Sequence, residues 1–126
     1  MATIKSFSDL QQSKKLAEIL PLESADMWWL YVTSQGKHIA MLYGEPDPHY
    51  IARMESYGIK DAAIRCWSLA ALLSVLPNVI NNETLFIETS PALWHIGYRN
   101  IYTARADNPV DACYEMIIRL NELKML

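Results

Sequence analysis

The sequence predicts an α+β fold with an antiparallel sheet of about five strands and three helices, in the order α-β-β-α-β-β-β-α. Three observations lead to this prediction. Apolar residues recur at helical spacing near both ends of the chain and in its middle, aromatic and β-branched runs lie between these segments, and short polar turns divide the runs. With 126 residues, 52% of them hydrophobic, the chain is expected to fold as a single domain over 1–126.

The first predicted helix runs from about Asp9 to Leu20. Ser8 is followed three residues later by Gln11, which is the form of a capping box, in which each side chain bonds the backbone N–H of the other residue. Apolar residues then recur at helical spacing until Pro21, which cannot continue a helix.

Two strands are predicted next, MWWLYVT at 27–33 and KHIAMLY at 37–43, because both are rich in aromatic and β-branched residues. Gln35 and Gly36 between them are typical of a hairpin turn. The following segment, 44–58, contains two prolines and is bounded by two glycines. We predict an irregular connection with room for a short helical turn, and long connections of this kind often carry function.

The stretch CWSLAALLSVLP, 66–77, predicts a short helix from Leu69 to Leu76, with Ser68 as its N-cap and Pro77 at its end. A longer helix that starts at Asp61 is left open. The short helix is apolar nearly all round, so it must be covered on more than one side. We expect it to belong to the core, and the alternative is an interface with a partner or a second copy.

Three short strands are predicted between 83 and 106, with the sequences TLFIE, LWHIGY and IYTARA. Polar turns at 90–91 and 99–100 separate them. Side-chain alternation in the second strand divides its residues between two faces, with Trp94, Ile96 and Tyr98 on one and His95, Gly97 and Arg99 on the other.

The last helix has the clearest local signals. Asn108 can cap it, Pro109 suits its first position, and Asp111 places negative charge near the positive end of the helix dipole. A single apolar stripe follows at helical spacing. Glu115 and Arg119 are four residues apart, so they can form a favourable ion pair on the exposed side.

Composition narrows the function classes. With 11 basic and 14 acidic residues, the net charge of −3 gives no broad electrostatic surface for nucleic acid. No apolar run reaches the ~18 residues that a membrane span needs, and no secretory signal begins the chain, so we expect a cytoplasmic protein without a membrane partner. Cys66 and Cys113 lie in apolar surroundings, which indicates buried thiols rather than a disulfide.

The sequence contains no motif of an enzyme or a metal site. His38, His49 and His95 lack the spacing of metal ligands, and there is no glycine-rich phosphate loop and no nucleophile motif. We therefore expect no catalytic residue, no metal ligand and no cofactor, and we predict that the chain is not an enzyme.

Aromatic residues on the predicted strands are the main candidates for a binding surface. Trp28 and Trp29 must point to opposite sheet faces, so one can be core while the other is exposed, unless helices cover both faces. An exposed aromatic face with nearby arginines can bind a protein partner or stack on bases. The candidate interaction residues on the strands and in the 44–58 connection are Trp29, Tyr31, Asp47, His49, Tyr50, Arg99 and Arg105.

Three segments carry a resemblance: QQSKKLAEILPLESADMWW, WSLAALLSVLP and ADNPVDACYEMIIRLNELKML. Together they resemble a group of small uncharacterised proteins encoded in bacteriophages, prophages and related mobile elements. In that group a Ser- or Thr-capped Leu-rich helix ends in Leu-Pro, and the chain closes with an acidic helix rich in small residues. The resemblance implies no particular activity and no functional residues.

Two functional hypotheses follow. The first is a non-enzymatic interaction module of phage or mobile-element origin that binds a protein partner, with a homodimer left open. The second is a small nucleic-acid-binding domain, because the order of helix, three strands and helix from Ser68 onward is that of double-stranded RNA-binding domains. That class usually begins its final helix with lysines, whereas this chain has Asp107, Asn108, Pro109 and Asp111 there. The first hypothesis is therefore favoured.

Overall fold

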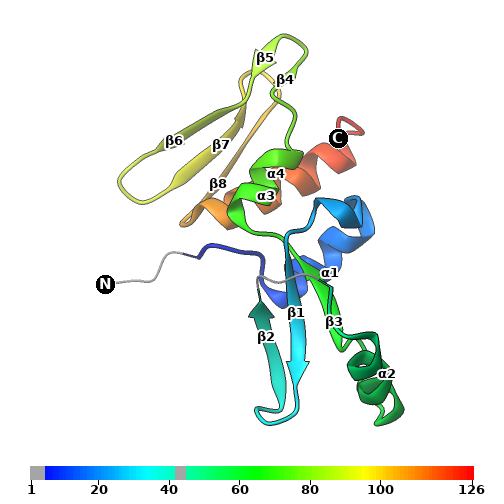
Figure 1. Ribbon diagram of the computed structural model, residues 1–126. Helices are drawn as coiled ribbons and strands as arrows, with labels where there is room; N and C mark the ends of the chain where they lie inside the picture. The colour runs from blue at the N-terminus through cyan, green and yellow to red at the C-terminus, as the bar shows by residue number, and fades with distance from the viewer. Residues whose placement is uncertain (1–4, 42–44) are drawn as a thin grey trace. The chain divides into compact units, whose positions relative to one another are not determined.

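The α+β class is confirmed by the computed structural model, which describes residues 5–41 and 45–126 (Figure 1). The helices in these residues are α1 (Leu10–Ile19), α2 (Pro48–Ser56), α3 (Leu69–Val75) and α4 (Pro109–Glu122), with a short 3₁₀ helix η1 (Leu22–Ser24). The strands are β1 (Met27–Val32), β2 (Lys37–Met41), β3 (Ala63–Cys66), β4 (Val79–Ile80), β5 (Glu83–Thr84), β6 (Phe86–Thr89), β7 (Trp94–Tyr98) and β8 (Tyr102–Ala106). No helix in the described part of the chain combines the length and the apolar character needed to cross a membrane.

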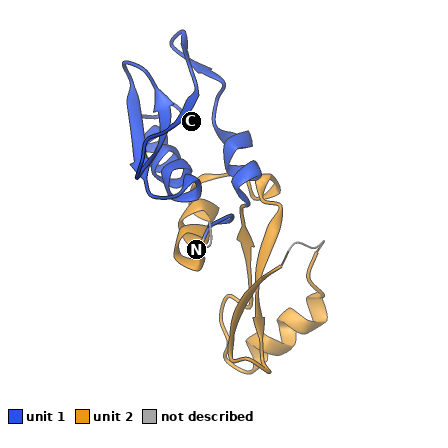
Figure 2. Cartoon of the chain, turned by 90° about the vertical axis from the view of Figure 1, so that its left-hand side faces the viewer, with its two compact units in different colours: residues 1–8, 68–126 blue, residues 9–67 orange. Residues whose placement is uncertain are grey.

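The chain divides into two compact units (Figure 2). The N-terminal unit consists of residues 9–67 and contains α1, α2 and a three-stranded antiparallel sheet in the order β2-β1-β3. The C-terminal unit consists of residues 1–8 and 68–126 and contains α3, α4, the hairpin β4-β5 and the antiparallel sheet β6-β7-β8. A single domain over 1–126 stays a prediction.

In the N-terminal unit, α1 packs against β3. The strand register pairs Met27 with Cys66 and Trp29 with Ile64, so these four side chains share one face of the sheet. Ile64 and Cys66 are 8% and 0% exposed. The face that carries these residues is therefore the one that α1 covers.

Two hydrogen bonds join distant segments of the same unit. The indole N–H of Trp67 donates to Ser24 Oγ at 2.9 Å, which holds η1 next to the end of β3. The hydroxyl of Tyr50 donates to the carbonyl of Tyr31, which ties α2 to β1. Hydrogen bonds thus hold η1 and α2 in this unit, and α1 is held by its packing against β3.

In the C-terminal unit, α4 packs against β7 and β8, and α3 packs against α4. The side chains buried here include Leu72, Ile96, Tyr98, Ala104, Val110, Cys113, Met116, Ile117 and Leu120. Ile96 and Ala104 are cross-strand neighbours, so they lie on the face that α4 covers. The N-terminal segment joins this unit through an ion pair, in which Lys5 Nζ lies 2.7 Å from Asp111 Oδ1.

Local signals predict α4 and the first hairpin correctly. Asn108 accepts a hydrogen bond from the Asp111 N–H at 2.9 Å, and Pro109 is the first helical residue. Arg119 forms its ion pair with Glu122 at 3.3 Å, rather than with the predicted partner four residues earlier. The β1-β2 hairpin is confirmed as far as Met41, and the last predicted strand residues, 42–43, lie outside the described residues.

The start of α3 at Ser68 is also confirmed, and the longer helix from Asp61 is wrong. Ser68 Oγ accepts a hydrogen bond from the Ala71 N–H at 3.1 Å, which caps α3. Residues 63–66 form β3 instead of a helix. Pairing with β1 fixes this strand, and a four-residue run carries too little local pattern to indicate it.

The prediction of three helices is wrong, because a further helix, α2, takes up much of the segment 44–58, for which the sequence predicts an irregular connection with a short helical turn. The proline that suggested a break starts the helix. Asp47 caps it by accepting the His49 N–H at 3.0 Å, and Pro48 takes the first helical position, where no N–H is needed. The rest of the predicted connection before residue 45 lies outside the described residues.

The capping box of α1 is present but lies one residue later than predicted. Asp9 accepts the Gln12 N–H at 2.8 Å, and the Gln12 side chain accepts the Asp9 N–H at 3.0 Å. Ser8 is buried and does not cap the helix. Two adjacent residues that both favour the N-cap make a shift of one position undetectable from the pattern alone.

A single sheet of about five strands is also wrong. The strands of the two halves form separate three-stranded sheets, and a small hairpin, β4-β5, precedes β6. Asn81 and Asn82 turn this hairpin with φ angles of 50° and 67°, as a two-residue hairpin turn requires. The predicted strand TLFIE is therefore split, with its start in the hairpin and its end in β6.

Candidate functional site

The outer edge of β3, the side that faces away from β1, presents backbone hydrogen-bonding groups. Bonded and non-bonded residue pairs alternate along an antiparallel ladder. The Tyr31 N–H donates to the Ala62 carbonyl at 2.8 Å, so Ile64 also bonds toward β1. The N–H and C=O groups of Ala63 and Arg65 therefore point outward, and within 5–41 and 45–126 no strand pairs with them.

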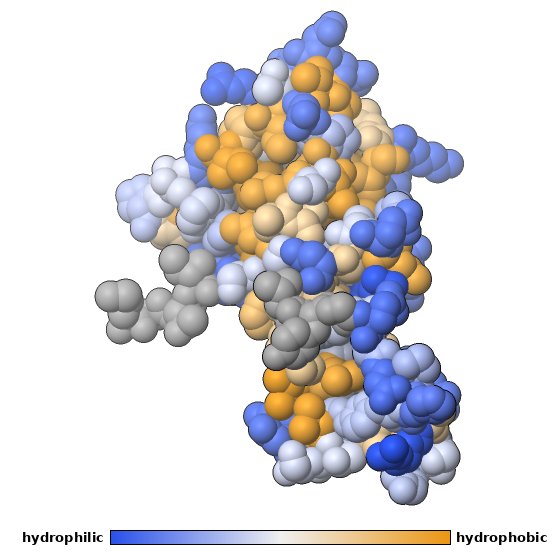
Figure 3. Space-filling model, viewed as in Figure 1, coloured by the Kyte–Doolittle hydropathy of each residue, from blue (hydrophilic) through white to orange (hydrophobic). Residues whose placement is uncertain are grey.

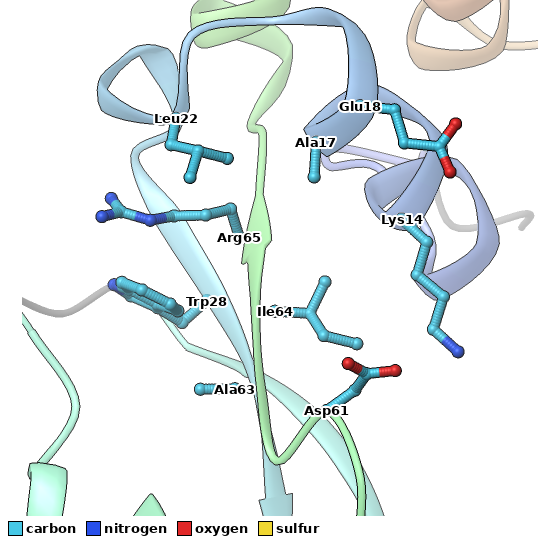
Figure 4. Close-up of a pocket in the computed structure, with 9 residues that line it drawn as sticks. All are labelled: Lys14, Ala17, Glu18, Leu22, Trp28, Asp61, Ala63, Ile64 and Arg65. Carbon is cyan, nitrogen blue, oxygen red and sulfur yellow. The ribbon is translucent and has the colours of Figure 1, made fainter.

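A groove with a volume of about 560 Å³ lies along this edge (Figure 4). Its lining residues are Lys14, Ala17, Glu18, Leu22, Trp28, Asp61, Ala63, Ile64 and Arg65. Figure 4 shows β3 between two groups of side chains. Leu22, Arg65 and Trp28 lie on one side, which we call the Trp28 wall, and Lys14, Ala17 and Glu18 lie on the other side, the α1 wall. We call the whole feature the β3 groove.

The two walls follow from local structure. Ala17 and Glu18 come three and four residues after Lys14, so both are neighbours of Lys14 on one face of α1. Leu22 is presented by η1 and is 46% exposed. Trp28 is the cross-strand partner of Arg65, so the two side chains project together on the sheet face that α1 does not cover.

Arg65 stacks on Trp28 within the Trp28 wall. Its Cζ atom lies 4.2 Å from the ring centroid, where the negative face of the indole attracts a cation. The second contact of the guanidinium is with Glu45, whose Oε1 lies 3.6 Å from Arg65 Nη2. The Glu45 side chain is 80% exposed and that of Arg65 is 26% exposed. The ring therefore holds the guanidinium in place, while its carboxylate partner lies in solvent.

The sheet face that carries Trp28 is partly open to solvent. Leu30, Ile39 and Met41 share this face and are half-buried. Figure 3 shows hydrophobic residues at the surface in the lower part of the view, where the β1-β2 hairpin lies in Figure 1. The Trp28 wall thus borders an apolar sheet surface.

Five predicted interaction residues lie in the N-terminal unit but do not line the β3 groove. Trp29 is on the face that α1 covers, and it is half-buried. Tyr31 accepts the hydrogen bond from Tyr50 through its carbonyl. Asp47 and His49 are exposed at the start of α2, where the first caps the helix. Their role in binding a partner stays a prediction.

The other two predicted residues, Arg99 and Arg105, lie in the C-terminal unit. Arg99 is 3.6 Å from Glu88 and its Cζ lies 5.7 Å from the Phe86 ring centroid. Arg105 Nε donates to Nδ1 of His95 at 3.3 Å. Both arginines are thus engaged by neighbours on the β6-β7-β8 sheet, and their role at an interface stays a prediction.

Ser90, His95 and Arg105 are the side chains whose arrangement comes nearest to a nucleophile site. Ser90 Oγ lies 3.0 Å from His95 Nε2, within the distance that a nucleophile and its base require. A guanidinium only donates, so the contact from Arg105 makes Nδ1 the acceptor and leaves the proton of a neutral ring on Nε2. Nε2 then donates to Ser90. This arrangement therefore cannot withdraw the hydroxyl proton from Ser90.

The two cysteines are buried and are not joined in a disulfide, as predicted. Burial raises the pKa of the Cys113 thiol from 9.0 to about 12. Burial, and secondly the nearby Cys113, raises the pKa of the Tyr98 hydroxyl from 10.0 to about 12. A nucleophilic cysteine needs a lowered pKa, so Cys113 is a core thiol. Among the described residues, no group of three His, Cys, Asp or Glu side chains could hold a metal ion.

We expect Cys113 to reduce the stability of the protein at alkaline pH. Above about pH 9 the thiol of the unfolded chain loses its proton, whereas the folded-state pKa of about 12 keeps the buried thiol protonated. The unfolded state then binds fewer protons, so the free energy of unfolding falls as the pH rises from about 9 toward about 12. Urea unfolding at several pH values measures this slope. Cys113→Ala should make the slope shallower, and an unchanged slope would contradict the expectation.

The sequence does not predict the groove residues Trp28, Arg65 and Leu22 as interaction residues. Alternation places Trp28 and Trp29 on opposite faces but does not say which face a helix covers. Arg65 lies in a segment for which no strand is predicted. The sequence therefore does not say which sheet edge its backbone faces or which sheet face its side chain is on. The sequence signal for a strand here is the run AIRC, residues 63–66. Four residues are too few to distinguish a strand from other structures.

No protein-family model matches the chain, and comparisons with curated proteins and with solved structures found no match either.

Proposed function

We propose that this chain is a non-enzymatic interaction module that binds an extended segment of a partner protein as an added strand on β3. The observation that carries the proposal is the outward-facing backbone of Ala63 and Arg65 inside the β3 groove. Strand addition uses such an edge, because main-chain hydrogen bonds supply affinity and pockets for alternate side chains supply specificity. The cytoplasmic setting and the phage or mobile-element origin rest on the sequence alone.

The β3 groove adds side-chain contacts to the backbone hydrogen bonds that the edge of β3 can form. An added strand would place alternate side chains against the Trp28 wall and the α1 wall, since successive residues of a strand point to opposite faces. Both walls contain apolar surface, from Leu22 and Trp28 on one side and Ala17 on the other. A short strand such as β3, with two N–H and two C=O groups directed outward, gains affinity from these side-chain contacts.

A proline scan of β3 tests the proposal. Ala63→Pro removes a donor from the outer edge, where proline is tolerated, so the unfolding midpoint should stay close to that of the parent chain. Linear peptides selected from a random display library on the full chain provide the ligand. We expect Ala63→Pro to weaken their binding at least tenfold, and the amide signals of Ala63 and Arg65 to shift when these peptides bind the parent chain, measured by NMR.

The matched control is Ile64→Pro, which removes a donor that bonds toward β1. It leaves the Trp29 carbonyl without its donor and also removes the buried Ile64 side chain, so the free energy of unfolding should fall by more than the cost of an unpaired group, about 1–3 kcal/mol. A second control avoids mutation of the chain: N-methylation of alternate peptide residues should abolish binding only at residues whose N–H faces β3. Failure to select any peptide, or peptides that bind Ala63→Pro as tightly as the parent chain, would disprove strand addition.

A further inference from the structure

We propose that the β3 groove selects an extended segment with a carboxylate side chain opposite Arg65, so that the partner is an acidic strand. The inference rests on the proposed function, because without strand addition no side chain is held opposite Arg65. It adds the chemistry of the ligand, which backbone pairing alone does not specify.

The first observation is the position of Arg65 in the β1–β3 ladder. Its backbone groups point to the outer edge, while its side chain lies on the sheet face that carries Trp28. In an antiparallel pair the Cβ atoms of directly opposed residues are about 4.5–5.5 Å apart, so an added strand brings one side chain next to the guanidinium. Opposite charges at such positions attract, and like charges repel.

The second observation is that positive and negative side chains are distributed unevenly between the two sides of the groove. Arg65 is the cation of the Trp28 wall, whose other side chains, Leu22 and Trp28, are uncharged (Figure 4). The acidic lining residues Glu18 and Asp61 appear on the other side of β3. A carboxylate that enters along the Trp28 wall therefore meets a positive charge next to apolar surface, whereas a lysine there meets repulsion.

The third observation is that the Arg65 guanidinium is fixed by Trp28 and only weakly paired with a carboxylate. Trp28 fixes its position at 4.2 Å, and its contact with Glu45 is long, at 3.6 Å, to a side chain that is 80% exposed. A carboxylate on an added strand would be less exposed and could form two parallel hydrogen bonds to the planar guanidinium. Glu45 thus occupies the place of the ligand carboxylate and is displaced when the partner strand binds.

The same geometry defines the neighbouring position of the ligand. The residue two positions from the carboxylate lies on the same face of the added strand, since side chains alternate. It is placed opposite Ala63, next to the Trp28 ring, where a small or medium apolar side chain fits the lining. The expected ligand pattern is therefore an acidic residue and an apolar residue separated by one position.

Parallel selections test the inference. A random display library of linear peptides is selected on the parent chain, on Arg65→Gln and on Arg65→Glu, and enriched peptides are synthesised for affinity measurement by isothermal titration. We expect Asp or Glu at one fixed position on the parent chain, no charge preference on Arg65→Gln, and Lys or Arg on Arg65→Glu. Replacement of the acidic residue by its amide should weaken binding to the parent chain at least tenfold, and binding to Arg65→Gln by less than threefold.

Lys14→Gln is the matched control, because Lys14 is a cation of the same groove on the α1 wall. It should leave the acidic preference unchanged. Peptides that shift the β3 amide signals without an acidic preference, or a preference that persists on Arg65→Gln, would overturn the inference and leave strand addition standing. Peptides that bind elsewhere would overturn both proposals. A dimer of the parent chain that Ala63→Pro converts to a monomer, seen by equilibrium sedimentation, would show that the occupant is a second copy.

Discussion

Trp67→Ala is expected to lower the free energy of unfolding by about 3–5 kcal/mol, the range for removal of a fully buried large aromatic side chain. Trp67 directly follows β3 and is 0% exposed. Its indole N–H also donates to Ser24 Oγ at 2.9 Å, so the substitution removes both packing and a hydrogen bond. Because a domain is typically stable by only about 5–15 kcal/mol, this one change should remove a large part of the total. Urea unfolding followed by circular dichroism measures it.

Trp67→Phe separates the contribution of packing from that of the hydrogen bond. It keeps an aromatic ring in the cavity, so a large part of the packing should remain. Ser24→Ala removes the same hydrogen bond from the acceptor side, and the bond itself should be worth about 1 kcal/mol. A double-mutant cycle between Trp67→Phe and Ser24→Ala isolates that value. If Trp67→Ala cost less than about 1 kcal/mol, the ring would not be packed as the structure describes.

The elements that sequence predicts well are those with signals inside the element itself. Asn108 and Pro109 define the start of α4 by a side-chain cap and a fixed φ angle, and both act within one helical turn. Ser68 does the same for α3. The turn at Gly36, with φ of 64°, needs a residue that tolerates the left-handed region. These preferences act within the element and do not depend on tertiary contacts.

The elements that sequence misses depend on contacts between distant residues. β3 exists because Ala63–Cys66 pairs with β1, and α1 then covers one face of the result. For α2 the difficulty is different, since a proline can either end a preceding helix or start a following one, and Pro48 starts α2. One proline therefore supports two opposite interpretations. The structure shows the second one, with Asp47 accepting a hydrogen bond from the His49 N–H as the helix cap.

The candidate site is hidden from the sequence for the same reason. The β3 groove combines residues from α1, η1, β1 and β3, and its outward-facing backbone groups are set by the register with β1. Sequence alternation correctly places Trp28 and Trp29 on opposite faces of the sheet, but neither composition nor spacing says which of these faces a helix covers. The packing of α1 against β3 decides this, on the face that also carries Trp29, and the position of α1 is a tertiary property.

Gly97→Ala is expected to be the most damaging change in the C-terminal unit for its size, with a loss of about 3 kcal/mol or more in the free energy of unfolding. Gly97 on β7 pairs with Thr103 on β8. A Cβ atom at Gly97 would lie 2.3 Å from the Tyr102 carbonyl oxygen and 2.7 Å from Thr103 Cα. Both are backbone atoms, so the clash cannot be relieved by rotation of a side chain, and the two strands must move apart.

Gly36→Ala is the matched control for the change from glycine to alanine. A Cβ atom there meets nothing within 4 Å, but the φ angle of +64° is unfavourable for alanine, which should cost about 1–2 kcal/mol. The control thus shows backbone strain without a clash, whereas Gly97→Ala shows the clash. Hydrogen exchange followed by NMR should report faster exchange in β7 and β8 for Gly97→Ala only. Stability of this variant within about 0.5 kcal/mol of the parent chain would mean that β7 and β8 do not approach so closely at Gly97.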